Sequence, residues 1–366
     1  MDESPAHAGA PRRDIDWVAG AALTGCVLCW GSTPVMLRRL AEAVDAWVAN
    51  GIRYPFAGIL YWPVLVWAAR RGLLTAATFR ACIVPASLAL AGQILWGMCP
   101  YYLSASAIGF YVRMSLVWSV LFAMWLFRDE RRLLRRGTFH AGVLASVVGF
   151  TGLSWLRGSL DAEVTAAGVL LITICSMFFG GYAVSVRRYL RDVHPIVAFA
   201  VVCQFVSAGT LLLMWPLGDL SVLPRLTPLE WGLMLGSSLL GIGLGHIFLY
   251  TGVRRVGASI SSGVQTAGPF VTVVLAMVFL GEKMSPGEWL SGLLMIAGAS
   301  LLFMAQRELH EPADQTHRSA AHRHGAGGAV VPDTAPGGPS HAAQHVFTTE
   351  SPSGSVTATV AEADVS

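Results

Sequence analysis

The chain has 366 residues, of which 54% are hydrophobic and only 13% are charged, and its mean hydropathy is +0.58. Soluble globular domains carry about 25% charged residues, so this composition excludes an ordinary water-soluble domain. The formal net charge is only +3, and the basic residues form short clusters between apolar segments. This pattern excludes a folded basic face for nucleic acid.

Ten apolar segments follow one another along the chain. Each has about 20 residues, enough to cross a hydrocarbon core of about 30 Å as a helix. We expect transmembrane helices at residues 17–37, 47–68, 82–103, 106–127, 138–156, 166–186, 196–217, 230–252, 257–280 and 287–306. The predicted fold class is an all-α membrane protein with ten transmembrane helices.

These segments form two similar blocks of five. The similarity is clearest between residues 104–149 and 256–298, where Glu130 and Glu282 hold the same position after the fourth span of each block. A repeat with an odd number of spans re-enters the membrane upside down, which is typical of secondary transporters. We therefore predict two inverted five-helix repeats, at 17–156 and 166–306.

The basic residues of the loops alternate in number. Loops 2, 4, 6 and 8 carry thirteen arginines, whereas loops 1, 3, 5, 7 and 9 carry five basic residues, among them Arg157. Because basic residues accumulate on the cytoplasmic side, this predicts a multi-pass protein of the plasma membrane with both termini in the cytoplasm. Residues 1–16 are expected to form a polar lead and residues 307–366 a disordered tail. The tail holds six of the ten histidines, irregularly spaced, which favours a solvated tail over a metal site.

No motif indicates catalysis or a bound cofactor. All six cysteines lie within apolar spans, including Cys26 and Cys29 of a C-x-x-C pattern, which favours packing over a redox or zinc role. The glycines of the eighth span, Gly241, Gly243 and Gly245, follow no strand and also indicate helix packing. The chain contains no phosphate-binding G-x-x-x-x-G-K-[ST] loop, so ATP-driven transport is not indicated.

Several short motifs are shared with a known family. They are Trp30-Gly31-Ser32-Thr33-Pro34, Arg53, Gly257-Ala258-Ser259, Pro269, Gly281-Glu282-Lys283-Met284-Ser285, and Trp289, Gly292 and Gly298 in the tenth span. With them, the chain resembles the EamA-type members of the drug/metabolite transporter superfamily over about residues 17–305. The first repeat departs from the pattern, because Val117 stands opposite Pro269 and Arg113 opposite Gln265. The resemblance implies export or exchange of small metabolites, often amino acids, without a fixed substrate signature.

Polar residues inside the spans are candidates for substrate contacts, because burial in hydrocarbon is costly for them. Arg113 has no partner among its sequence neighbours, so we expect its guanidinium to face a cavity and bind a carboxylate or phosphate. Arg53 either does the same or extends to the outer interface. His246 either couples proton movement to transport or bonds to a neighbouring helix. The other candidates, neutral or aromatic, are Gln93, Trp96, Gln265, Thr266, Trp30, Trp118, Tyr182 and Tyr250; aromatic side chains also serve in helix packing and in the interfacial belt.

The acidic residues lie in tails, loops and span ends. Glu130 and Glu282 are interpreted as structural groups that pair at the membrane surface. The absence of carboxylates from the span interiors disfavours a lipophilic-cation pump, whereas an anionic or zwitterionic solute such as an amino acid fits Arg113.

The leading hypothesis is a secondary transporter, an exporter or exchanger, that works by alternating access between its two halves. Two alternatives are a membrane-embedded enzyme acting on a lipid-linked substrate, with Asp129, Glu130 and His140 as its nearest cluster, and a sensor or scaffold whose tail recruits a partner. We predict no enzymatic activity, cofactor or metal site. The expected partners are a small-molecule substrate, the lipid bilayer and protons, and the expected state is a monomer because one chain holds both halves.

Overall fold

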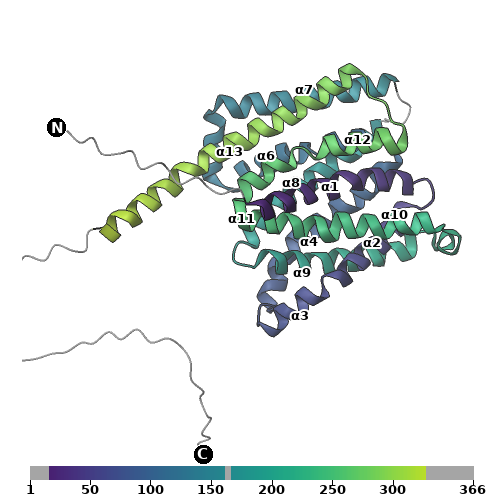
Figure 1. Ribbon diagram of the computed structural model, residues 1–366, viewed down its shortest axis with the longest axis horizontal. Helices are drawn as coiled ribbons and strands as arrows, with labels where there is room; N and C mark the ends of the chain where they lie inside the picture. Colours follow the sequence, from purple (N-terminus) through teal and green to yellow (C-terminus); the bar gives the residue numbers. More distant parts are fainter. Residues whose placement is uncertain (1–15, 161–165, 327–366) are drawn as a thin grey trace, which may run out of the picture. The chain divides into compact units, whose positions relative to one another are not determined.

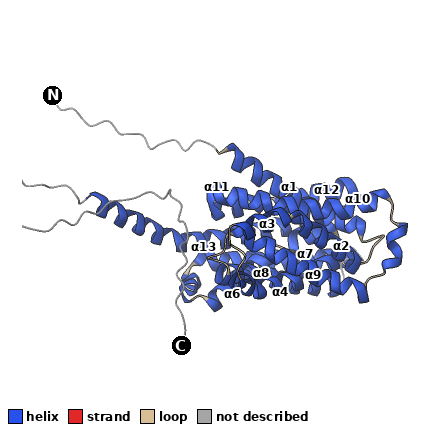
Figure 2. Cartoon of the chain, turned by 90° about the horizontal axis from the view of Figure 1, so that it is seen from below, coloured by secondary structure: helices blue, strands red, loops and turns tan. Residues whose placement is uncertain are grey.

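The structure, a computed structural model, describes residues 16–160 and 166–326, and within these ranges its elements are helices joined by turns, without strands (Figures 1 and 2). The predicted lead lies outside the described residues except for Asp16, and so does the predicted tail beyond residue 326.

The first repeat contains five spans, and two of them are interrupted. In chain order its elements are α1 (Trp17–Leu40), α2 (Ala46–Leu60), α3 (Trp62–Arg70), α4 (Ala76–Met98), the short turn η1 (Cys99–Tyr101), α5 (Ala105–Tyr111), α6 (Met114–Leu126), η2 (Arg128–Arg135) and α7 (Gly137–Leu160). The second span is the pair α2 and α3, and the fourth is the pair α5 and α6.

The second repeat has the same number of spans. Its elements are α8 (Ala166–Tyr189), α9 (Pro195–Leu217), η3 (Leu220–Arg225), α10 (Pro228–Ser238), the π-helical turn η4 (Leu239–Leu244), α11 (Gly245–Gln265), α12 (Gly268–Leu280) and α13 (Pro286–Ala326). α11 holds the end of the eighth span and the start of the ninth, and it bends between them at Gly257. The φ angle of Gly257 is 88°, a conformation that glycine adopts without steric cost.

The spans agree with the sequence prediction except in their interruptions and ends. Among the described residues, nine helical stretches are long and apolar enough to cross a membrane. The remaining predicted span, 47–68, is divided at Tyr61, where Pro63 in the first turn of α3 has no N–H to continue the helix. At the other end of the chain, α13 continues past residue 306 to Ala326, so the predicted tail begins as helix.

The fourth span of each repeat is broken at nearly the same position, within two residues of the alignment that places Arg113 opposite Gln265. In the first repeat the break at Val112 and Arg113 separates α5 from α6, and in the second the break at Thr266 and Ala267 separates α11 from α12. Pro269 in the first turn of α12 accounts for the second break. α5 packs against α12. The two broken spans are therefore neighbours in the bundle.

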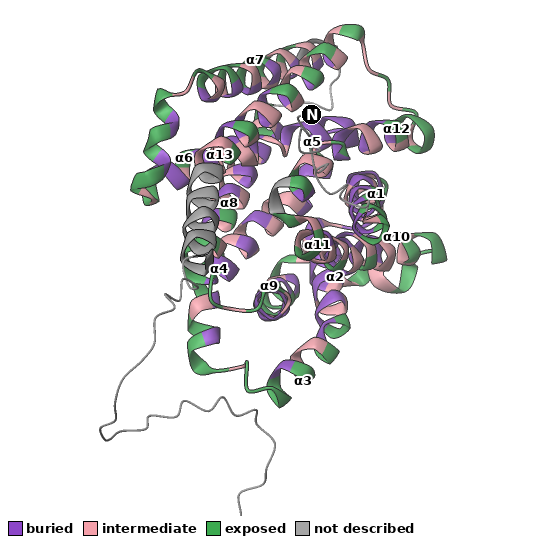
Figure 3. Ribbon diagram, turned by 60° about the vertical axis from the view of Figure 1, so that its left-hand side comes forward, coloured by how far each residue is buried: buried purple, intermediate pink, exposed green. Residues whose placement is uncertain are grey.

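Small residues bring the last span of each repeat into close contact. α7 and α13 lie side by side (Figure 1), and a Cβ atom on Gly298 would stand 2.7 Å from the carbonyl oxygen of Gly142. A Cβ atom on Gly149 would stand 2.6 Å from the carbonyl oxygen of Ser291. Figure 3 shows buried and exposed residues on the same helices, as expected where one helix face meets its neighbours and another meets lipid.

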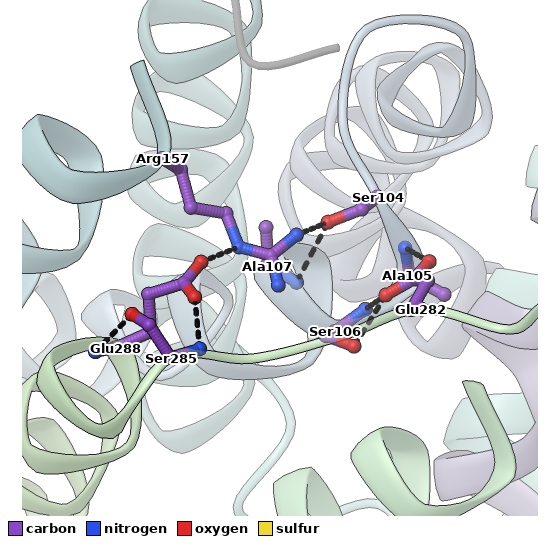
Figure 4. Close-up of polar contacts among 8 residues, drawn as sticks. All are labelled: Ser104, Ala105, Ser106, Ala107, Arg157, Glu282, Ser285 and Glu288. Carbon is purple, nitrogen blue, oxygen red and sulfur yellow. Dashed lines mark hydrogen bonds and ion pairs between the residues drawn. The ribbon is translucent and has the colours of Figure 1, made fainter. Parts of the chain in front are cut away.

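A buried polar cluster joins α5, α7 and α13 at the end of the bundle opposite loops 2, 4, 6 and 8 (Figure 4). Arg157 of α7 pairs with Glu288 of α13, with 2.6 Å between Nε and Oε1, and also donates to the hydroxyl of Ser104. The predicted placement of Arg157 in a loop is wrong, because α7 is longer than predicted and encloses this side chain between helices.

The two corresponding glutamates are structural, with different partners. The carboxylate of Glu282 accepts hydrogen bonds from the backbone N–H groups of Ala105 at 2.7 Å and Ser106 at 3.0 Å, and so caps the first turn of α5 (Figure 4). Glu130 is buried and lies 2.5 Å from the guanidinium of Arg187, at the end of α8. Each glutamate therefore connects one repeat to the other.

Candidate functional site

A cavity of about 420 Å³ lies between the two repeats. Residues from α1, α2, α4, α5, α6, α8, α9, η4, α11 and α12 contribute to its wall. Eight of the predicted site residues line it: Trp30, Arg53, Gln93, Trp96, Arg113, Tyr182, His246 and Gln265. The helices thus bring together residues that are up to about 200 positions apart in the chain.

Arg113 stands at the break between α5 and α6. Its Nε atom is buried, and among the described residues its side chain forms no hydrogen bond or ion pair. One of its terminal nitrogens lies 2.6 Å from the point that a Cβ atom on Gly268 would occupy. Gly268, at the start of α12, therefore leaves the room that the guanidinium fills.

Arg53 is held in place by neutral groups. Its Nε donates to the hydroxyl of Ser237 at 2.9 Å, and one terminal nitrogen donates to the side-chain oxygen of Asn50 at 3.2 Å. The residue is 2% exposed, which excludes the alternative that its side chain extends to the membrane interface. Asn50 donates in turn to the backbone carbonyl of Gln93 at 3.1 Å, so α2, α4 and α10 share one polar network.

His246 lies in an aromatic part of the wall. Its ring stacks on Phe199 with 3.9 Å between centroids, and Trp30 meets it edge-on at 5.2 Å. Its Nδ1 lies 3.0 Å from the carbonyl oxygen of Ile242 in the preceding turn η4. A hydrogen at Nδ1 satisfies this contact and leaves Nε2 as an acceptor.

The π-helical turn η4 shapes this wall. Its wider winding leaves backbone carbonyls without helical partners. The indole N–H of Trp30 donates to the carbonyl of Gly241 at 2.9 Å, and the hydroxyl of Tyr61 donates to that of Gly243 at 2.8 Å. A Cβ atom on Gly245 would stand 2.4 Å from the Trp30 indole nitrogen. Gly241 and Gly245 thus serve close packing, as the sequence indicated, whereas a Cβ atom on Gly243 would find only ordinary van der Waals contacts, the nearest at 3.4 Å.

Three predicted site residues do not line the cavity. Trp118 packs against Phe122 with 6.0 Å between ring centroids. Tyr250 lies behind the wall, 6.0 Å from the ring of Phe199. The hydroxyl of Thr266 donates to the carbonyl of Gly263 at 2.6 Å. These contacts show that all three side chains take part in helix packing in this structure.

The cavity wall also contains residues that were absent from the predicted site. They are mainly aromatic or small: Tyr54, Phe179, Phe199, Gly109, Gly268 and Thr272. The sequence does not show which apolar residues of an apolar span face the cavity. For Gly268 the local sequence signal is the neighbouring Pro269, which favours a helix break at this place.

The electrostatic character of the cavity is positive. Two arginines line it, and none of the described lining residues is acidic. Within the described part of the chain, no group of three or more His, Cys, Asp or Glu residues is placed to hold a metal ion. The arrangement suits a solute with a negative group and leaves aromatic surfaces for the rest of the molecule.

Two sets of five spans around a cavity lined in part by polar side chains are an arrangement typical of membrane transporters. The EamA-like transporter family matches residues 18–155 and 166–304 of this chain. The protein belongs to that family, with one copy of the family's repeat in each half.

Named relatives agree with this class. The chain is 28% identical over 192 residues to the uncharacterized transporter YwfM of Bacillus subtilis, covering 52% of this chain and 63% of the relative. It is 27% identical over 200 residues to a putative sugar uptake protein of Bacillus cereus, covering 53% of this chain and 67% of the relative. A solved crystal structure superposes with a TM-score of 0.53 at 17% identity, covering 79% of this chain and 98% of that one, which shows a shared fold.

Proposed function

We propose that the protein is a secondary transporter, an exporter or exchanger, of a small anionic or zwitterionic metabolite such as an amino acid. The carrying observation is the guanidinium of Arg113, which lies at a cavity without acidic lining residues and has no partner among the described residues. A buried charge without a partner is costly in a membrane. A carboxylate on the substrate would offset that cost with two parallel hydrogen bonds.

Efflux from proteoliposomes tests this proposal. The liposomes are loaded with a mixture of amino acids, organic acids, amines and sugars, and the loss of each solute is followed by mass spectrometry. Selective loss of a carboxylate-bearing solute is expected. Sugars belong in the mixture because a relative is described as a putative sugar uptake protein.

Variants of Arg113 connect the activity to the site. Arg113→Ala should reduce the flux at least tenfold, and Arg113→Lys should restore part of it, because lysine keeps the charge but not the bidentate geometry. Arg70→Ala is the matched control, since Arg70 is an exposed arginine outside the cavity. Equal flux in wild type and Arg113→Ala would contradict the role of Arg113. No selective flux in folded protein would favour the enzyme or sensor alternatives.

We further propose alternating access between the two inverted repeats, coupled to proton movement through His246. The equivalent breaks in the two fourth spans support such a motion, because they provide paired flexible points beside the cavity. His246→Gln should remove the response of the flux to a pH gradient while solute exchange persists. A full response to the gradient in that variant would exclude His246 as the coupling group.

The proposed cellular setting is the plasma membrane, with both termini cytoplasmic and one chain as the working unit. The arginine-rich loops 2, 4, 6 and 8 support the orientation. Labelling of a single engineered cysteine at Arg70 and another at Lys283 in intact cells distinguishes the two sides. Light scattering of the purified protein with its detergent subtracted tests the monomer.

A further inference from the structure

A second hollow lies on the outside of the helix bundle, between α4, α6 and α8. Its volume is about 450 Å³, and its wall is almost wholly apolar. Its lining residues include Val84, Leu88, Phe122, Leu126, Gly181 and Val184. We call this hollow the α4–α6–α8 groove.

The groove is separate from the central cavity. On α8, Phe179 and Tyr182 face the cavity, whereas Phe178 and Gly181 line the groove, so the helix divides the two. The groove opens to the surface, since Trp125 at its edge is 78% exposed. In a membrane this surface meets lipid chains.

Gly181 forms an open part of the groove wall. The atoms nearest to a Cβ atom on Gly181 would belong to Leu88 and Phe122, each at 3.8 Å, which is ordinary van der Waals distance. A larger side chain here would extend toward the groove side chains of Leu88 and Phe122. The space beside Gly181 is therefore available to an apolar chain.

Exposed arginines lie at one end of the groove, where α4, α6 and α8 meet loops 2, 4 and 6. Arg80 lies four residues before Val84 on α4, and Arg188 lies four residues after Val184 on α8, so each shares a helix face with a groove residue. Arg128 follows the last groove residue of α6 by two positions. Among the described residues, none of these three arginines forms an ion pair.

The acidic residues of the same loops are mostly engaged elsewhere. Glu130 is buried against Arg187, and Asp192 pairs with Arg191 at 3.1 Å. Asp129 is exposed and has no such partner within the described residues. The end of the groove therefore carries a net positive charge beside an apolar channel.

We propose that the α4–α6–α8 groove is a binding site for an anionic phospholipid, with an acyl chain in the groove and the phosphate at Arg80, Arg128 and Arg188. The apolar groove matches the acyl chain of such a lipid, and the arginines at its end match the anionic head group. The head group lies at the membrane surface and the chain in the interior, as in a lipid leaflet. Basic clusters at the ends of membrane helices attract anionic head groups in this way. The lipid would sit in the leaflet on the side of loops 2, 4, 6 and 8.

Native mass spectrometry of the full-length protein tests the site. The protein is titrated with dioleoyl phosphatidylglycerol and, separately, with dioleoyl phosphatidylcholine, which has the same chains and a neutral head group. We expect tighter retention of phosphatidylglycerol. Equal retention of the two lipids would overturn the proposal.

Two variants separate the head-group and chain contacts. The double variant Arg80→Ala/Arg188→Ala should weaken phosphatidylglycerol binding about 25-fold, at roughly fivefold per arginine, and weaken phosphatidylcholine binding much less, because its head group has no net charge. Gly181→Leu should weaken both lipids by filling the groove. The control Arg70→Ala/Arg71→Ala removes two exposed arginines from the same end of the bundle but away from the groove, and should change neither.

A photoactivatable phosphatidylglycerol with its reactive group in the acyl chain provides a second readout on wild-type protein, which needs no variant to fold. Crosslinks to α4, α6 and α8 near Leu88 and Phe122 support the site. Crosslinks confined to other helices, or binding by both variants at wild-type strength, would refute it. These measurements detect lipid binding alone, so their outcome does not depend on the proposed transport activity.

Discussion

Arg157 and Glu288 form an ion pair of 2.6 Å with side chains only 2% and 6% exposed. One belongs to the last span of the first repeat and the other to the last span of the second. The pair lies beside the capped start of α5, which leads directly to Arg113 (Figure 4). Contacts between the repeats at this end therefore support the helix that carries the cavity arginine.

Removal of one member of this pair should be strongly destabilising. Glu288→Ala leaves Arg157 as a buried charge without its carboxylate, so we expect a loss of about 3–5 kcal/mol in unfolding free energy. Denaturant unfolding in detergent measures it. The exposed pair Arg39 and Glu42 provides the control, because Glu42→Ala should cost at most about 1 kcal/mol. Similar losses in the two variants would show that burial of the Arg157 pair has little consequence.

The cap formed by Glu282 should matter more than the adjacent charge. Glu282→Ala removes the acceptor for two backbone N–H groups of α5, and we expect it to lower stability by about 1–2 kcal/mol. Lys283→Ala is the control, since Lys283 is exposed and next in sequence. Thermal unfolding of both variants gives the comparison. A greater loss in Lys283→Ala would contradict the capping role.

Gly268 should act on transport through the position of Arg113. In Gly268→Ala the new methyl group would stand 2.6 Å from the guanidinium, so the side chain must move. Displacement of a binding group by about 1 Å can cost on the order of 100-fold in rate, and we expect at least a tenfold loss of flux.

The control for this substitution lies one turn away. Gly263→Ala adds the same methyl group where no atom lies within 4 Å, and should leave the flux unchanged. Transport assays in proteoliposomes, with thermal unfolding to verify folding, make the comparison. Equal flux in Gly268→Ala and Gly263→Ala would show that transport does not depend on the position of the Arg113 guanidinium.

The contact between α7 and α13 should tolerate no side chain at Gly298. A leucine there would meet the backbone nitrogen of Ser146 and the carbonyl oxygen of Gly142, so the helices must separate. We expect Gly298→Leu to lower stability by about 1–3 kcal/mol or more. Gly20→Leu, in an open part of α1, should change it by less than about 1 kcal/mol. Unfolding free energies that are the same for both variants would rule out the close contact.

The sequence by itself determined the membrane class, the spans and the repeat. These follow from the length of apolar segments and from the matching positions of Glu130 and Glu282, which are local properties of the chain. The sequence also marked Arg113, because a charge inside an apolar span is conspicuous without any knowledge of its neighbours.

Only the tertiary structure decided which side chains share the cavity. Arg53, Gln93 and His246 line it while Trp118 and Tyr250 do not, although all five lie in apolar spans. The face that a membrane helix turns inward depends on its packing against other helices, so hydropathy alone does not reveal it. For the same reason the sequence did not reveal the ion pair between Arg157 and Glu288. These residues are 131 positions apart and meet only when α7 packs against α13.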